Sequence, residues 1–198
     1  MTNKRFYRFI LWHPNTLTIA RIIAVPILIV FMMFFKSVLM MRLSALVFIL
    51  ASITDYLDGY FARRYGLESN FGRLIDPLAD KLLVVLAFIM LSSIGWVAGW
   101  IVCIIVGREL LITGFRAVIA KENSQVVAAS WLGKYKTIFQ IIALFALILH
   151  YPVFGINVEA IGNFFLWPAV ILTIWSAVDY FIRFGRVFFS VDNNAQKG

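Results

Sequence analysis

The chain has 198 residues, of which 62% are hydrophobic and only 14% are charged, and its formal net charge is +8. Because a soluble domain has about 25% charged residues, this composition excludes a soluble fold, including a soluble basic domain that would bind nucleic acid, and indicates a polytopic membrane protein of one domain. The single cysteine, Cys103, excludes an internal disulfide and a metal site built on several thiolates.

Residues 1–13 form the first predicted element. Lys4, Arg5 and Arg8 lie there among large apolar side chains. This mixture predicts a short amphipathic juxtamembrane segment that lies on an anionic membrane surface. We expect a six-helix domain over residues 14–186 and a cytoplasmic tail over residues 187–198.

Six apolar segments follow, each close to the ~20 residues that a helix needs to cross a bilayer. They are Leu17–Phe35, Leu43–Phe61, Leu74–Ile94, Trp96–Phe115, Leu132–Leu149 and Ile161–Phe184. The predicted fold class is therefore all-α and integral to the membrane, with six transmembrane helices. With the N-terminus in the cytoplasm, every lysine and arginine except Lys36 and Arg42 falls on the cytoplasmic side, so the positive-inside rule places both termini there.

Charged residues interrupt the cytoplasmic half of each predicted helix and leave the outer half apolar. Such groups face a bundle interior or a water-filled cavity, and they mark functional sites. The pattern predicts a polar cavity within the inner leaflet that opens to the cytoplasm. The interrupting residues are Arg21, Asp55, Asp58, Asp76, Asp80, Arg108, Glu109, Lys134, Lys136, Asp179 and Arg183.

Four aspartates between positions 55 and 80 give the strongest functional signal. Asp55 and Asp58 are three residues apart, and Asp76 and Asp80 are four residues apart, so each pair lies on one face of a helix. Two facing helices would bring four carboxylates together, and such oxygen ligands select hard cations such as Mg²⁺ or Mn²⁺. Considered alone, Asp76 before Pro77 also fits a helix N-cap followed by proline at the first helical position.

The residues around these aspartates form a longer pattern, D-x-x-D-G-x-x-A-R-x8-G-x-x-x-D-x-x-x-D, which begins at Asp55 and ends at Asp80. In every fixed position it resembles the signature of the CDP-alcohol phosphatidyltransferases, and the resemblance extends from Pro14 to about Tyr180. It implies an enzyme that transfers the phosphatidyl group of CDP-diacylglycerol to an alcohol and releases CMP. It also implies a homodimer in the bacterial inner membrane, with its active site on the cytoplasmic side.

The resemblance assigns a role to each matching residue. Asp55, Asp58, Asp76 and Asp80 would bind two Mg²⁺ or Mn²⁺ ions that neutralise the pyrophosphate, and Asp80 would also act as the general base. The stretch that begins at Asn15 also fits a plain helix start, with Asn15 or Thr16 as the cap. CDP-diacylglycerol would be bound by Asn15, Thr18, Arg21, Gly59, Ala62, Arg63 and Gly72.

Two later stretches indicate the acceptor. Gly107-Arg108-Glu109-Leu110 with Arg116, and Gly133-Lys134-Tyr135-Lys136-Thr137, are similar to the bacterial phosphatidylglycerophosphate synthase branch, whose acceptor is sn-glycerol 3-phosphate. The similarity implies that Arg108, Arg116, Lys134 and Lys136 bind this acceptor, and arginine does bind phosphate bidentately. Glu109 is expected to neutralise part of this positive set. Lys134 and Lys136 also fit plain topology signals at the start of a helix.

Three other functions share part of this pattern. A sister phosphatidyltransferase that uses phosphatidylglycerol, inositol or serine would carry the same aspartates. A small cation or solute carrier would use the carboxylates to bind its cargo, but a carrier usually shows repeats and broken helices in two halves. A prenyl transferase also binds magnesium through aspartates, but the pattern of Gly59, Ala62 and Arg63 does not suit it.

Overall fold

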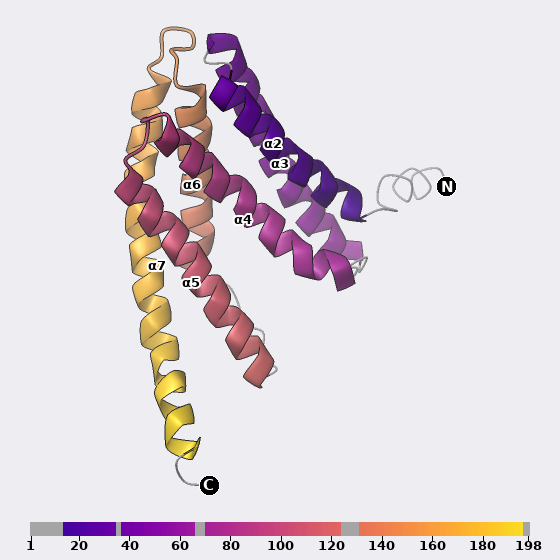
Figure 1. Cartoon of the computed structure of the whole chain (residues 1–198), viewed down its shortest axis with the longest axis vertical. Coiled ribbons are helices and arrows are strands. Elements are labelled where there is room, and N and C mark those ends of the chain that lie inside the picture. The colour runs from indigo at the N-terminus through magenta and orange to yellow at the C-terminus, as the bar shows by residue number, and fades with distance from the viewer. Residues whose placement is uncertain (1–13, 35–36, 66–69, 124–130, 196–198) are drawn as a thin grey trace, which may run out of the picture.

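The computed structural model describes the backbone of residues 14–34, 37–65, 70–123 and 131–195, and the side chains of residues 22–34, 37–54, 81–115, 133 and 135–182. The described residues form six α-helices and no strand, which confirms the predicted all-α class (Figure 1). The predicted amphipathic segment at residues 1–13 lies outside the described residues. The helices are α2 (Pro14–Phe34), α3 (Val38–Tyr65), α4 (Asn70–Ser93), α5 (Gly99–Asn123), α6 (Trp131–Leu149) and α7 (Val158–Ala195).

Successive helices run in opposite directions. In Figure 1, α2, α4 and α6 run upward and α3, α5 and α7 run downward. The starts of α2, α4 and α6 and the ends of α3, α5 and α7 therefore lie toward the same side of the molecule. We call this side the site end, because it carries the charged residues that interrupt the apolar segments.

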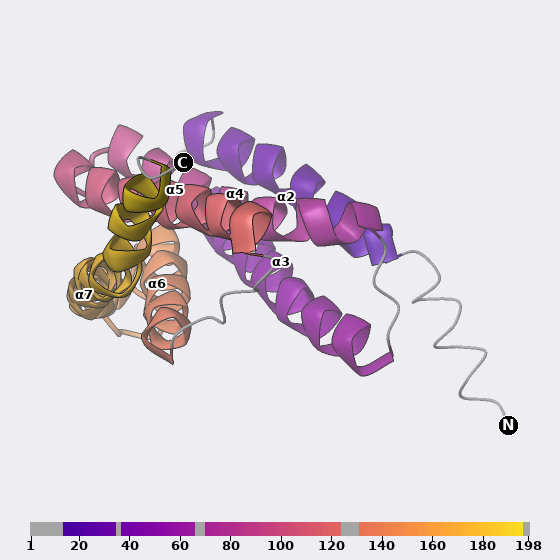
Figure 2. The same ribbon diagram turned by 90° about the horizontal axis from the view of Figure 1, so that it is seen from below.

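The helices contact one another unequally. α2 packs against both α3 and α4, and α6 packs along α7 and also against α3 and α4. α5 packs against α7 and α4. Figure 2 shows α6 and α7 side by side at one edge, while α2 and α3 extend toward the opposite edge.

The core between these helices is apolar and closely packed. A single cluster of buried residues joins α2 to α7, and its largest fully buried side chains include Phe48 of α3, Phe88 of α4 and Leu144 of α6. Large apolar side chains are exposed on the outside of the same helices, such as Phe164 and Trp175 of α7. A bundle that is apolar inside and outside is typical of a chain whose surface contacts lipid.

One described stretch, Val158–Ile182, is long and apolar enough to cross a membrane by length and composition. Within the described side chains, shorter apolar stretches occur on four other helices. α5 carries Arg108 and Glu109 near its middle. The shorter stretches are Ile22–Phe34, Val38–Thr54, Lys81–Ser93 and Tyr135–Leu149.

The end of the molecule opposite the site end is tied by an aromatic contact. α4 ends at Ser93 and is followed by Gly95 with a positive φ of 82°, a conformation that glycine adopts without strain. The next residue, Trp96, stacks on His150 with ring centroids 3.6 Å apart and planes at 7°. The turn between α4 and α5 is therefore fastened to the turn between α6 and α7.

Gly162 permits the close approach of α7 to α6. A Cβ atom at Gly162 would lie 2.7 Å from Cγ and 3.0 Å from the backbone N of Leu147. We predict that Gly162→Ala destabilises the protein by ~1–3 kcal/mol, because overpacking forces side chains and backbone to shift. Denaturant unfolding in detergent micelles would measure this loss.

Gly114→Ala is the matched control for this change. Gly114 lies inside α5, and no atom lies within 4 Å of the Cβ position there. Because alanine has the higher helix propensity, this variant should be neutral or stabilised by up to ~1 kcal/mol. Equal stability of both variants would contradict the role of Gly162 in the α6–α7 contact.

Candidate functional site

The aspartate motif is divided between α3 and α4 at one level of the bundle. Asp55 lies ten residues before the end of α3 at Tyr65, and Asp80 lies ten residues after the start of α4 at Asn70. With a rise of 1.5 Å per residue, each is about 15 Å from its end of the helix. The two helices are antiparallel, and the end of α3 lies on the same side as the start of α4 (Figure 1). Their backbones therefore place the two aspartates at similar depth.

Asp58 and Asp76 also lie at similar distances from the adjacent ends of their helices. Asp58 lies seven residues before the end of α3, and Asp76 lies six residues after the start of α4. α3 and α4 contact each other over only a short stretch, and α2 packs against both of them. The motif is therefore carried by two helices that a third helix holds in place. The side chains of residues 55–80 lie outside the described part of the chain.

The helix bounds correct two interpretations of the sequence. α4 begins at Asn70, so Asp76 is the seventh residue of the helix and not its N-cap. α2 begins at Pro14, so Asn15 and Thr16 lie within the first turn and neither is the cap. Proline is favoured at the first helical position because its missing N–H group has no intrahelical partner there. In both helices the true start lies earlier than the capping pattern indicated.

The basic set near the site end is organised around one carboxylate. Arg108 is the tenth residue of α5, and its NH1 lies 3.2 Å from Oε1 of Glu109. Lys136 of α6 donates from Nζ to the same oxygen. The side chains of Arg108, Glu109 and Lys136 are 12%, 10% and 4% exposed, so this is a buried cluster. The expectation that Glu109 neutralises part of the basic set is confirmed.

The burial of Lys136 also tests whether this lysine is only a topology signal at the start of a helix. A lysine that serves only as a topology signal lies in water or at the lipid headgroups, whereas Lys136 is buried and ion-paired. The plain topology-signal interpretation is therefore wrong for Lys136. The side chains of Lys134 and Arg116 lie outside the described residues, and their backbones lie on α6 and α5.

A hydrogen-bonded chain connects this cluster to the aspartate helix. Lys81, which directly follows Asp80 on α4, donates from Nζ to Oγ1 of Thr113 on α5. The hydroxyl of Thr113 donates in turn to the backbone oxygen of Glu109 at 2.6 Å. α4, α5 and α6 are thus linked by polar contacts close to Asp80. Our sequence interpretation gave no role to Lys81 or Thr113, because no motif contains them.

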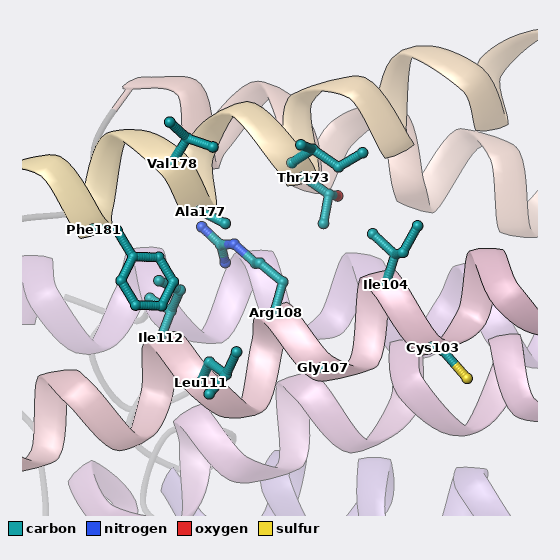
Figure 3. Close-up of a pocket in the computed structure, with 11 residues that line it drawn as sticks. Cys103, Ile104, Gly107, Arg108, Leu111, Ile112, Thr173, Ala177, Val178 and Phe181 are labelled. Atoms are coloured by element: carbon teal, nitrogen blue, oxygen red, sulfur yellow. The ribbon is translucent and has the colours of Figure 1, made fainter.

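A groove of about 390 Å³ lies between α5 and α7. Figure 3 shows the Arg108 side chain reaching from α5 toward Ala177 of α7, and Phe181 and Ile112 line the same groove. Arg108 and Thr173 supply its charged and hydroxyl groups, and the other lining side chains are apolar apart from the thiol of Cys103. The groove therefore differs from the predicted polar cavity, whose aspartate walls lie outside the described side chains.

The remaining predicted site residues are placed by their backbones alone. They lie near the start of α2, α4 and α6, near the end of α3, and in the second half of α5, so their helices bring them toward the site end. Arg108 and Lys136 are the predicted site residues whose side chains are described, and both contact Glu109. The others are Asn15, Thr18, Arg21, Asp55, Asp58, Gly59, Ala62, Arg63, Gly72, Asp76, Asp80, Arg116 and Lys134.

Comparison with known proteins adds a second line of information. Residues 11–175 match the family model described as CDP-alcohol phosphatidyltransferase. A Bacillus subtilis protein named CDP-diacylglycerol–glycerol-3-phosphate 3-phosphatidyltransferase is 42% identical over 86% of this chain and 93% of its own. Proteins with the same name from Rickettsia typhi and Salmonella typhimurium are 43% and 37% identical, over 85% and 84% of this chain and 94% and 91% of their own.

The contact between Lys81 and Thr113 gives a stability prediction. Thr113→Val keeps the shape of the side chain but removes the oxygen that accepts from Lys81. Because a hydrogen bond to a charged group contributes about 1.5–3 kcal/mol, the free energy of unfolding should fall by about that amount. The control is Thr137→Val, since the hydroxyl of Thr137 bonds within its own helix to Gly133 at 3.1 Å. Equal losses in both variants, measured by denaturant unfolding, would argue against an α4–α5 link.

Proposed function

Because the chain belongs to the CDP-alcohol phosphatidyltransferase family, we propose that it transfers the phosphatidyl group of CDP-diacylglycerol to sn-glycerol 3-phosphate. The products are phosphatidylglycerophosphate and CMP, and the reaction is a step of phospholipid biosynthesis. Relatives that share about 40% identity over most of both chains and bear this activity in their names support the assignment. The observation that carries it in this chain is the complete aspartate motif on α3 and α4.

The donor set of the motif fits a hard cation. Four carboxylates lie on two helices, at depths that match in pairs, and oxygen donors favour Mg²⁺ or Mn²⁺ over softer metals. Asp55, Asp58, Asp76 and Asp80 would hold two such ions. Bound ions of this kind supply positive charge that neutralises the pyrophosphate of CDP-diacylglycerol.

The chain's own residues then carry the transfer. Asp80 accepts the proton of the attacking acceptor hydroxyl, whose oxygen forms a bond to the phosphorus of the phosphatidyl group. The bond from that phosphorus to the oxygen of CMP breaks, and CMP leaves. The nucleotide and its phosphates are held near the site end, with Gly59 and Ala62 small enough for close approach. The donor-binding residues are Asn15, Thr18, Arg21, Gly59, Ala62, Arg63 and Gly72.

The acceptor is held by the basic residues of α5 and α6. A phosphate monoester carries up to two negative charges, and Arg108, Arg116, Lys134 and Lys136 supply four positive charges. Glu109 balances one of them, which leaves a surplus for the acceptor. Inositol and serine bring no phosphate to such a site, and this favours glycerol 3-phosphate over these alternatives.

The family and the charge pattern support a proposed placement in the membrane. The family is integral to the membrane, and we propose six transmembrane helices in a bacterial inner membrane. The site end would face the cytoplasm, with both termini and a polar cavity on that side and the chains paired as a homodimer.

Single cysteines introduced at either terminus of a Cys103→Ser background should react with an impermeant maleimide only after the membrane is opened. Labelling from outside the intact cell would contradict this topology.

An acceptor panel tests the proposed reaction directly. Purified protein in detergent is incubated with CDP-diacylglycerol and glycerol 3-phosphate, glycerol, inositol, serine or phosphatidylglycerol, and both CMP release and the lipid product are measured. We expect phosphatidylglycerophosphate with glycerol 3-phosphate and little product with the others. A different preferred acceptor would identify a sister enzyme. No CMP release with any acceptor would remove the proposal.

A further prediction concerns the metal. Asp58→Asn removes one anionic ligand, so metal binding and neutralisation of the pyrophosphate should weaken together. We expect CMP release to fall at least ~100-fold in this variant and to stop in excess chelator, with recovery on addition of Mg²⁺ or Mn²⁺. The control is Asp179→Asn on α7, which lies outside the motif. Undiminished turnover in excess chelator would exclude a metal-dependent reaction.

Another prediction concerns acceptor selectivity. Arg116→Ala should remove a charge-assisted contact worth about 1.5–3 kcal/mol, which is a roughly ten- to hundredfold rise in the KM for glycerol 3-phosphate. The KM for CDP-diacylglycerol should stay close to that of the unmodified enzyme, because the donor lies on other helices. A defect confined to donor affinity would show that Arg116 belongs to the donor site.

A further inference from the structure

The Glu109 carboxylate lies between two cations that the proposed function assigns to the acceptor. Its Oε1 accepts from Lys136 Nζ and lies 3.2 Å from Arg108 NH1. All three side chains are largely buried. A buried carboxylate is unfavourable unless it is paired and hydrogen-bonded, so the cluster exists as a unit: two cations with one anion between them.

The Lys136–Glu109 contact spans two helices that lie apart. Among the described residues, α5 makes extensive contacts with α4 and α7 but not with α6. The ion pair is therefore a link between α5 and α6 that backbone packing does not supply. A lysine side chain is long and flexible, and the carboxylate fixes where its ammonium group lies. The backbone oxygen of Glu109 accepts from the Thr113 hydroxyl, which also accepts from Lys81 of α4.

We propose that Glu109 is a positioning residue for the acceptor phosphate. It holds the Lys136 ammonium and the Arg108 guanidinium in one arrangement, and the phosphate of glycerol 3-phosphate binds to the cations held in that way. Glu109 itself does not touch the acceptor, since two anions repel each other. Cations that are already ordered bind a ligand more tightly, because less conformational freedom is lost on binding. This inference rests on the proposed function.

The direction in which Glu109→Gln changes the KM for glycerol 3-phosphate separates a positioning role from an effect of charge alone. Glu109→Gln keeps the size of the side chain and removes its negative charge. If Glu109 acted through its charge alone, this variant would attract a phosphate more strongly and the KM for glycerol 3-phosphate would fall. If Glu109 positions the cations, that KM should rise roughly ten- to hundredfold. The KM for CDP-diacylglycerol should change less than twofold in either case.

The test measures kcat and both KM values for Glu109→Gln, Lys136→Met and the double variant. Because Glu109 acts mainly through Lys136, adding Glu109→Gln to Lys136→Met should change the acceptor KM little beyond the single lysine variant. The control is Glu159→Gln, since Glu159 lies in the first turn of α7, far from the site end, and is half exposed. A lower acceptor KM for Glu109→Gln, or effects that multiply in the double variant, would overturn the proposal.

A conservative variant keeps the proposal testable if Glu109→Gln does not fold. Glu109→Asp retains the charge but shortens the side chain by one methylene, which withdraws the carboxylate from Lys136. Positioning predicts a raised acceptor KM with a near-normal kcat. An effect of charge alone predicts no change, and that result would also overturn the proposal.

The unmodified enzyme separates failure of this inference from failure of the proposed function. If it makes no product from glycerol 3-phosphate in the acceptor panel, the proposed function fails and the positioning role fails with it. If it uses glycerol 3-phosphate but both Glu109 variants leave the acceptor KM unchanged, the positioning role alone is wrong.

Discussion

A charge inside an apolar bundle needs a partner, and this requirement determines how α4, α5 and α6 are joined. The side chains of Arg108, Glu109 and Lys136 are largely buried, so each charged group must reach another polar group. Glu109 meets this need for Lys136 and Arg108 with one carboxylate oxygen. Thr113 does the same between Lys81 and the backbone of α5. The polar contacts thus form a continuous set rather than isolated pairs.

The rest of the bundle is arranged around this polar layer. Apolar packing supplies contact between the helices, and the backbones approach closely where Gly162 of α7 meets Leu147 of α6. The charged residues are gathered toward the site end. In the proposed orientation, an inner-leaflet lipid and a soluble compound would both be within reach of that end. An enzyme that joins a lipid to a water-soluble alcohol needs both environments in one site. The division of each helix into an apolar and a polar part provides them.

The sequence predicted the helices well because their signal is local. The expected segment Leu132–Leu149 differs by one residue from α6, whose long apolar run follows Lys134 and Lys136. The end of α7 was less predictable, since the apolar pattern stops at Phe184 while the helix continues to Ala195. Asp76 shows the limit of capping rules: the dipeptide with Pro77 resembles a helix start, yet the helix begins at Asn70.

The site was predictable in its motif and less so in its contacts. The spacing from Asp55 to Asp80 indicates both chemistry and family, because the residues that carry it are close in the sequence. The bond from Lys81 to Thr113 joins residues 32 positions apart, and that from Lys136 to Glu109 joins residues 27 apart. Such pairs depend on how the helices pack, and neither residue of the first pair belongs to a recognisable pattern.

The glycine contact between α6 and α7 has a consequence for how this protein tolerates change. Lys136 and Leu147 belong to the same helix, eleven residues or about 16 Å apart. A helix transmits rotation and translation along its axis nearly as a rigid rod, so a shift at Leu147 moves the Lys136 ammonium as well. Variation at the far end of the bundle is therefore coupled to the charged layer. Differences in substrate affinity between related chains can arise from buried packing residues that no ligand ever contacts.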